Sequence, residues 1–165
     1  MKKTLLALAL IGASATASAD SWIYGSASVG QADLGGESAS SYNVHVGTGI
    51  LPFIGLEAGY QTFGEFDNAK YDNKTLDLDG SAVYFAAKPS IDFGPLHVYA
   101  KAGLHSYKLE DKSAGFKEEE INTMYGVGAE YFMMGPISLG ASYNVYTLEE
   151  DEIENFSLNA TFHFL

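Results

Sequence analysis

Four charged residues interrupt segments that are otherwise apolar or neutral, and they are the first candidates for chemistry. They are Glu57, Lys88, Lys101 and Glu130. Each falls on the polar side of a stretch in which polar and apolar residues alternate. Two carboxylates and two ammonium groups can form ion pairs without net charge, and a buried charge is costly unless it is paired. We therefore predict an internal Glu/Lys network whose role is structural.

Histidines on the same side of the alternation offer a second chemistry. His45, His97 and His105 could line a proton or ion path together with the four charges, and this alternative stays open at the level of sequence. His105 is followed by Ser106, a base next to a nucleophile. Consecutive strand residues point to opposite faces, so these two side chains do not meet and we predict no enzymatic activity.

The elements that position these residues follow a period of two, which is typical of β-strands. Apolar residues such as Leu96, Val98 and Ala100 alternate with His97 and Tyr99 in the clearest segment. Helical periodicity is missing. Eight strands are predicted, over residues 22–30, 42–50, 55–63, 79–88, 96–107, 124–131, 137–146 and 155–165.

The connections between these strands alternate in length. Those after the second, fourth and sixth strands are short and hold every proline of the chain, whereas those after the first, third, fifth and seventh are long and polar, as in 64–77 and 108–122. Short turns on one side and long loops on the other are typical of outer-membrane barrels with about 9 to 11 residues per strand. The predicted fold is all-β, an eight-stranded antiparallel up-and-down transmembrane β-barrel.

The two faces of the strands predict which side meets lipid. The small, glycine-rich polar side suits the narrow interior of eight strands, so the aliphatic side faces lipid. Aromatic residues on that outer side gather near the strand ends and predict two membrane girdles. One girdle is Tyr42, Tyr60, Tyr125 and Tyr143, and the other is Tyr131, Phe162 and Phe164. A soluble lipocalin-like carrier, with the apolar side inward, is the structural alternative.

The N-terminus and the composition predict export. Residues 1–19 combine two lysines, a short apolar run and small residues, the pattern of a signal peptide cleaved before Asp20, which leaves 20–165 as the barrel domain. The chain has no cysteine, and 9 Lys stand against 21 Asp and Glu. Such acidity excludes a nucleic-acid partner. Outer-membrane lipid and lipopolysaccharide are the expected surroundings.

Acidic residues concentrate in three of the predicted loops, 67–79, 110–120 and 149–154. They predict an extracellular ligand that is basic or bridged by cations, and argue against heparin-like polyanions. Asp77, Asp79 and Gly80 look like part of a calcium loop, but the remaining ligand positions do not fit. We predict no cofactor and no dedicated metal site; weak Ca²⁺ or Mg²⁺ bridging to lipopolysaccharide phosphates remains a minor alternative.

The order of several stretches resembles the transmembrane domain of OmpA and the small OmpX, Ail and NspA barrels. These stretches are 22–30, 55–60, 86–104, 126–132 and 156–164. The resemblance implies a Gram-negative outer membrane and a lumenal ion-pair cluster at Glu57, Lys88, Lys101 and Glu130. In strand seven the family pattern suggests arginine, but this chain has Gly140. No peptidoglycan-binding domain follows, so the anchoring role of OmpA is not implied.

The last strand also carries a family feature. Its lipid-facing residues resemble the C-terminal signal that the barrel assembly machinery recognises, and they are Phe156, Leu158, Phe162 and Phe164. Leu165 follows on the opposite side. The resemblance favours a non-enzymatic envelope protein, adhesin-like, whose loops bind a host or environmental partner. A narrow porin-like channel is the alternative, and a lipid A modifying enzyme ranks third because the His-x-Ser spacing of the deacylases is missing.

Overall fold

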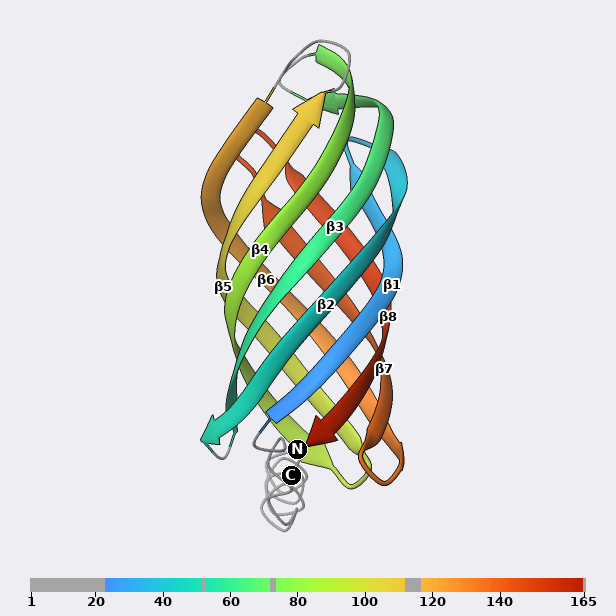
Figure 1. Cartoon of the computed structure of the whole chain (residues 1–165), viewed down its shortest axis with the longest axis vertical. Coiled ribbons are helices and arrows are strands. Elements are labelled where there is room, and N and C mark those ends of the chain that lie inside the picture. The colour runs from blue at the N-terminus through green and yellow to red at the C-terminus, as the bar shows by residue number, and fades with distance from the viewer. Residues whose placement is uncertain (1–22, 52, 72–73, 112–116, 165) are drawn as a thin grey trace, which may run out of the picture.

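Eight antiparallel strands close into one barrel, as the alternation predicts (Figure 1). In this computed structural model the described residues are 23–51, 53–71, 74–111 and 117–164. The signal peptide and Leu165 lie outside them. No helix in the described part is long and apolar enough to cross a membrane. The strands are β1 (Ile23–Leu34), β2 (Glu37–Leu51), β3 (Ile54–Tyr71), β4 (Lys74–Phe93), β5 (Leu96–Asp111), β6 (Lys117–Met134), β7 (Ile137–Thr147) and β8 (Glu152–Phe164).

The barrel closes between its first and last strands. β1 pairs with β8 from Ile23 opposite Phe164 to Asp33 opposite Glu154. Both ends of the described chain therefore lie at one end of the barrel, together with the turns after β2, β4 and β6 (Figure 1). Two of these turns are Gly-Pro pairs, in which Gly94 and Gly135 adopt φ angles of 64° and 58°. That left-handed backbone is open to glycine at little cost.

The prediction of long polar loops at the opposite end is wrong. β3 continues to Tyr71 and β4 begins at Lys74, so most of 64–77 is strand, and β1 joins β2 through only Gly35 and Gly36. The longest strand, β4, has 20 residues, well beyond the predicted span. The prolines also differ from expectation, because Pro89 lies within β4 opposite Ile54. The polar segments become strands because they enclose an apolar interior.

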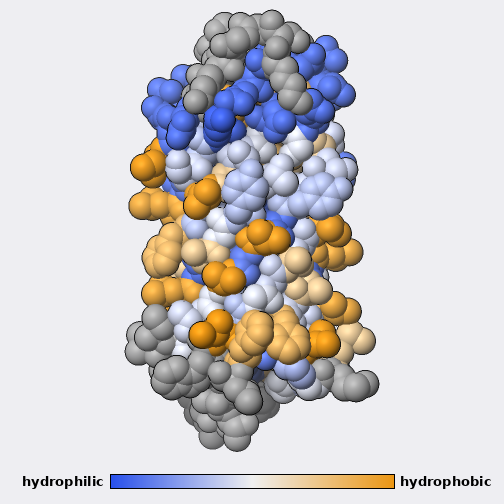
Figure 2. Space-filling model, viewed as in Figure 1, coloured by the Kyte–Doolittle hydropathy of each residue, from blue (hydrophilic) through white to orange (hydrophobic). Residues whose placement is uncertain are grey.

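The polarity of the two faces reverses along several strands, most clearly along β5, while the alternation continues. On β5 the inward side chains begin with His97, Tyr99 and Lys101 and continue to Tyr107 and Leu109, before the buried Asp111 ends the strand. The outward side chains of β5 run Leu96, Val98, Ala100, Ala102, Leu104, Ser106, Lys108 and Glu110. Figure 2 shows the result as an apolar belt below a hydrophilic cap. The lower part is thus built as a membrane barrel and the upper part as a water-soluble one.

The upper part has a conventional hydrophobic core. Its buried side chains come from all eight strands and from the β7–β8 connection, and they include Leu34, Phe63, Phe66, Leu78, Leu109, Tyr146, Leu148 and Ile153. Burying apolar area stabilises about 25 cal/mol per Å², so this core supplies the reason for continued strand pairing above the belt. The alternation in these segments is readable in the sequence, but their acidic outer face makes them resemble solvated loops.

Candidate functional site

One ion pair occupies the polar part of the lumen between β3 and β5. Lys101 donates a hydrogen bond to Oε1 of Glu57, and both side chains are buried. The Tyr24 hydroxyl donates to Oε2 of Glu57 at 3.0 Å, and the Tyr84 hydroxyl donates to Oε1 at 2.8 Å. His45 Nε2 lies 3.5 Å from Oε2 of the same carboxylate. Glu57 is therefore held by partners from four different strands, which ties β1, β2, β4 and β5 to β3.

A second ion pair lies closer to the turns after β2, β4 and β6. Lys88 Nζ is 3.7 Å from Glu130 Oε1, and both side chains are 1 % exposed. Ser138 donates its hydroxyl hydrogen bond to Glu130 Oε2 at 2.7 Å and lies 2.9 Å from His163 Nε2. The four charges that the sequence singles out thus face the lumen as two pairs, Glu57 with Lys101 and Lys88 with Glu130.

Tyrosine rings connect the two pairs. Lys88 Nζ lies 4.5 Å from the ring centroid of Tyr24 and 4.3 Å from that of Tyr99. Lys101 Nζ lies 5.4 Å from the centroid of Tyr99. Cations within about 6 Å of a ring face are attracted to it, more strongly when water is excluded. Sequence reasoning placed these tyrosines on the inner side but gave them no role.

Glycines opposite the lumenal tyrosines make room for the rings. Tyr24 pairs with Gly47, Tyr84 with Gly59, and Tyr99 with Gly128. A Cβ at Gly47 would lie 2.2 Å from Cζ of Tyr24, and a Cβ at Gly128 would lie 2.4 Å from Cζ of Tyr99. Each tyrosine ring lies over the glycine of the neighbouring strand. An inward tyrosine that has a glycine opposite it in the adjacent strand is therefore the sequence signal that could have located this network.

The histidines do not form a continuous path. His45 Nδ1 is 2.7 Å from Asn43 Oδ1, His97 Nδ1 is 2.5 Å from Asp92 Oδ1, and His105 Nε2 is 2.9 Å from the Thr147 carbonyl. Each histidine thus has its own partner at a different height. His105 is buried, whereas its neighbour in sequence points outward and is exposed. His105 and Ser106 therefore do not meet as a nucleophile and base.

Above the ion pairs, aromatic and aliphatic side chains fill the lumen. The Tyr146 ring packs edge-on against Phe63 with centroids 4.9 Å apart and against His105 at 5.2 Å. The Tyr107 hydroxyl accepts a hydrogen bond of 3.2 Å from the Glu149 backbone N–H in the β7–β8 connection. Tyr107 and Met124 belong to the hydrophobic core of the upper barrel, and we call this core the apolar plug. It stands between the paired charges and the end of the barrel opposite the short turns.

The comparisons with known proteins agree with this geometry. The family model described as outer membrane protein beta-barrel domain matches residues 4–164. The chain belongs to this outer-membrane β-barrel family. That membership assigns the barrel to the outer membrane, and the resemblance noted in the sequence is confirmed.

Solved structures of small outer-membrane barrels share the fold. The N-terminal barrel domain of Pseudomonas aeruginosa OprF is 21% identical, with a TM-score of 0.59 over 86% of this chain and 97% of that one. Neisserial surface protein A is 18% identical, with a TM-score of 0.59 over 86% and 96%. Yersinia pestis Ail, in complex with the heparin analogue sucrose octasulfate, is 16% identical, with a TM-score of 0.58 over 86% and 96%. No curated protein matches the chain.

In β7, Gly140 stands where the pattern of this outer-membrane barrel family suggests an arginine, and the space around it is too small for a larger side chain. Gly140 lies opposite Glu130 in the β6–β7 ladder. A Cβ there would stand 2.3 Å from the Ala129 carbonyl oxygen and 2.7 Å from Cγ of Glu130. No larger side chain fits there without moving β6, and the ammonium group 3.7 Å from Glu130 is that of Lys88 from β4.

The C-terminal strand of this family member presents its predicted residues to the outside. Phe156, Leu158, Phe162 and Phe164 are all exposed on the barrel wall. The Phe162 and Phe164 rings lie 4.8 Å apart, at the end where β1 and β8 close the barrel. Their recognition by the assembly machinery stays a prediction.

The acidic segments form the wall of the upper barrel. Their carboxylates stand on exposed or half-buried positions, and among the described side chains Lys108, 2.6 Å from Glu110, is the one base beside them. This acidic wall comprises Asp33, Glu37, Glu65, Asp67, Asp77, Asp79, Glu110, Glu119, Glu120, Glu149, Glu150, Asp151, Glu152 and Glu154. Because most of its backbone is paired in strands over an apolar core, the wall is a preformed surface.

Proposed function

We propose that the chain is a non-enzymatic outer-membrane protein that supports the envelope and presents the acidic wall to an extracellular partner carrying positive charge. The observation that carries this proposal is the reversal of polarity along the strands. It turns segments that read as loops into a rigid, acidic surface above the membrane. Preorganised charge favours fast and selective association with an oppositely charged partner.

The lumen supports a structural role for the barrel. Both ion pairs are buried and neutral as a group, and the apolar plug fills the space above them. An eight-stranded barrel offers little more than side-chain room inside. These features favour a closed lumen over the alternative of a narrow channel. Planar-bilayer recordings of the folded protein should show no large, steady conductance, and a steady conductance would support the channel instead.

The charge of the wall distinguishes this proposal from a heparin-binding one. Ail was solved with a sulfated heparin analogue. A polysulfated ligand would meet repulsion at Glu152 and Glu154 of β8 and at Asp33 of β1, which are exposed or half-buried on adjacent strands. We therefore expect the partner of this chain to carry lysine or arginine groups, or to bind through divalent cations.

A direct binding measurement tests the proposal. The barrel is reconstituted in neutral phosphatidylcholine vesicles and titrated with a fluorescent oligolysine peptide and, separately, with fluorescent heparin. Oligolysine should bind with an affinity that falls as salt rises, because exposed charges are screened beyond about 8 Å at 0.15 M ionic strength. Heparin should not bind. Binding of heparin without oligolysine would overturn the proposal.

A matched pair of variants locates the surface. The double substitution Glu152→Gln and Glu154→Gln neutralises two exposed wall positions and should weaken oligolysine binding several-fold. The control, Asp92→Asn, removes an acid near the turns at the opposite end of the barrel and should leave oligolysine binding unchanged. Equal effects of the two variants would mean that the peptide does not recognise the wall.

A further inference from the structure

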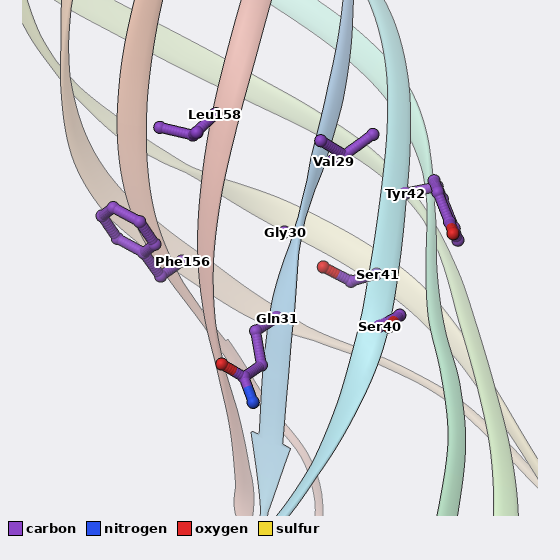
Figure 3. A pocket seen from close by; sticks show the side chains of 8 residues that line it. All are labelled: Val29, Gly30, Gln31, Ser40, Ser41, Tyr42, Phe156 and Leu158. Atoms are coloured by element: carbon purple, nitrogen blue, oxygen red, sulfur yellow. The ribbon is translucent and has the colours of Figure 1, made fainter.

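A hollow opens on the outer wall where β8, β1 and β2 meet, as Figure 3 shows. Six outward side chains surround it in two rows set by the strand register. The row nearer the middle of the apolar belt is Leu158, Val29 and Tyr42, and the row nearer the hydrophilic cap is Phe156, Gln31 and Ser40. Between the rows lies the backbone of Gly30 and Ser41.

The floor of the hollow is backbone, because Gly30 lies on the inward side of the alternation, opposite Ser41 and Ser157, between the outward side chains of Val29 and Gln31. A Cβ at this position would lie 2.1 Å from the Phe156 carbonyl oxygen and 2.7 Å from Cα of Ser157, so β1 and β8 approach too closely for any other residue. Ser41 leaves the hollow open as well, because its hydroxyl points into the lumen and donates to Asn155 Oδ1 at 2.5 Å. The resulting volume is about 370 Å³, which is within the range of small-molecule sites.

The hollow joins an apolar half to a hydrogen-bonding half. Val29 and Leu158 are exposed aliphatic side chains of the membrane belt, and Phe156 flanks them. Gln31 and Ser40 lie on the other side of Gly30, lower in Figure 3 and nearer the hydrophilic cap, at the level where the outward side chains of β1 and β2 turn polar. Other hollows on the wall, such as that lined by Phe53, Ile91 and Phe93, lie within the apolar belt itself. The Gly30 hollow therefore suits a lipid, whose acyl chain would lie in the apolar half and whose headgroup would lie in the hydrogen-bonding half.

The polar half selects the kind of headgroup. A glutamine amide and a serine hydroxyl both donate and accept hydrogen bonds, and neither carries charge. The next outward positions above Gln31 and Phe156 are Asp33 and Glu154, which lie opposite each other. Two carboxylates at this height disfavour a phosphate, which prefers arginine or lysine. A headgroup rich in hydroxyl groups satisfies the neutral pair without this repulsion.

We propose that the hollow binds one glycolipid of the outer leaflet through sugar hydroxyls. Its acyl chain lies against Val29 and Leu158 over Gly30, and its sugar hydrogen-bonds to Gln31 and Ser40. This site is separate from the acidic wall and does not depend on a cationic partner. It gives the barrel a fixed lipid neighbour at the junction where the chain closes on itself.

Lipid retention measured by native mass spectrometry tests the site. The barrel is reconstituted in vesicles holding equal amounts of phosphatidylethanolamine and a dephosphorylated lipid A disaccharide, then released and weighed with its bound lipid. We expect one retained glycolipid, preferred over the phospholipid by roughly tenfold, the effect of two net hydrogen bonds. The double variant Gln31→Leu and Ser40→Ala should lose this preference.

A second test fills the hollow with a larger side chain. Val29→Trp fills the hollow and should abolish glycolipid retention, whereas Val98→Trp, an outward substitution on β5, should retain glycolipid like the wild type. Folding of each variant is checked by its shift in gel mobility on boiling, and the Gln31/Ser40 variant decides the matter if Val29→Trp does not fold. Equal retention of both lipids by the wild type, or retention that requires phosphorylated lipid A, would overturn the proposal.

Discussion

The ammonium group of Lys88 lies 3.7 Å from the carboxylate of Glu130, inside a wall that excludes water from both. The contact joins β4 to β6, which are not neighbours in the sheet. It therefore braces the barrel across its lumen, a role that the ladder hydrogen bonds between adjacent strands cannot perform.

Loss of one partner should destabilise the barrel more than loss of both. Lys88→Met leaves the Glu130 charge buried without its cation, and breaking a buried pair costs about 3–5 kcal/mol. The double variant Lys88→Met and Glu130→Gln should be clearly more stable than the single one. Urea unfolding in lipid vesicles, followed by gel mobility, measures the free energy of unfolding. A double variant whose loss equals the sum of the single losses would show that the pair is not coupled.

The height of the polarity reversal can be mapped with arginine. Ala100 lies in the apolar belt on the outward side of β5, while Ser106 lies where the same side turns polar. Arginine on the lipid face costs about 2–4 kcal/mol at the bilayer midplane and about 0–1 kcal/mol near the interface. Ala100→Arg should therefore lower the free energy of unfolding far more than Ser106→Arg. Equal losses would contradict a membrane boundary between these two positions.

The tyrosine and glycine pairs should behave as units. Gly128→Ala places a Cβ where the Tyr99 ring now lies, and overpacking of this kind costs about 1–3 kcal/mol. Tyr99→Leu removes the ring, so the combined variant should lose less stability than the two single losses added together. A double-mutant cycle in vesicles measures this coupling, and strict additivity would mean that the glycine does not serve the ring.

Assembly should depend on the phase of the last strand. Phe164 stands on the outer face opposite Ile23 where the barrel closes. Phe164→Ser removes an aromatic residue from the predicted assembly signal and should reduce the amount of protein in isolated outer membranes. Deletion of Leu165, which follows on the other side, should leave that amount unchanged. Normal levels of the serine variant would argue against the signal.

Much of the lower barrel could be predicted from the alternation of polar and apolar residues, because in this part the apolar side always faces lipid and the polar side always faces the lumen. Alternation placed Glu57, Lys101 and Glu130 inward and Val98 and Leu158 outward, and the structure has them there. The prediction failed in the upper barrel, where the outer face meets water instead of lipid. Acidic residues such as Glu65 and Asp77 suggested loops, although the residues between them, including Phe66 and Leu78, form a buried core. Val145 keeps its predicted outward side, opposite Tyr125 and Glu154 in the two ladders, although its side chain is buried there.

By itself the sequence determined the number of strands, their direction and the face on which each charge lies, because a period of two records which side of a sheet a residue occupies. Only the tertiary structure decided which charge meets which. Glu57 pairs with Lys101, and Lys88 passes between Tyr24 and Tyr99 to reach Glu130. These choices depend on strand stagger around a closed barrel and on the space that opposite glycines leave, and neither is written in the alternation of a single strand.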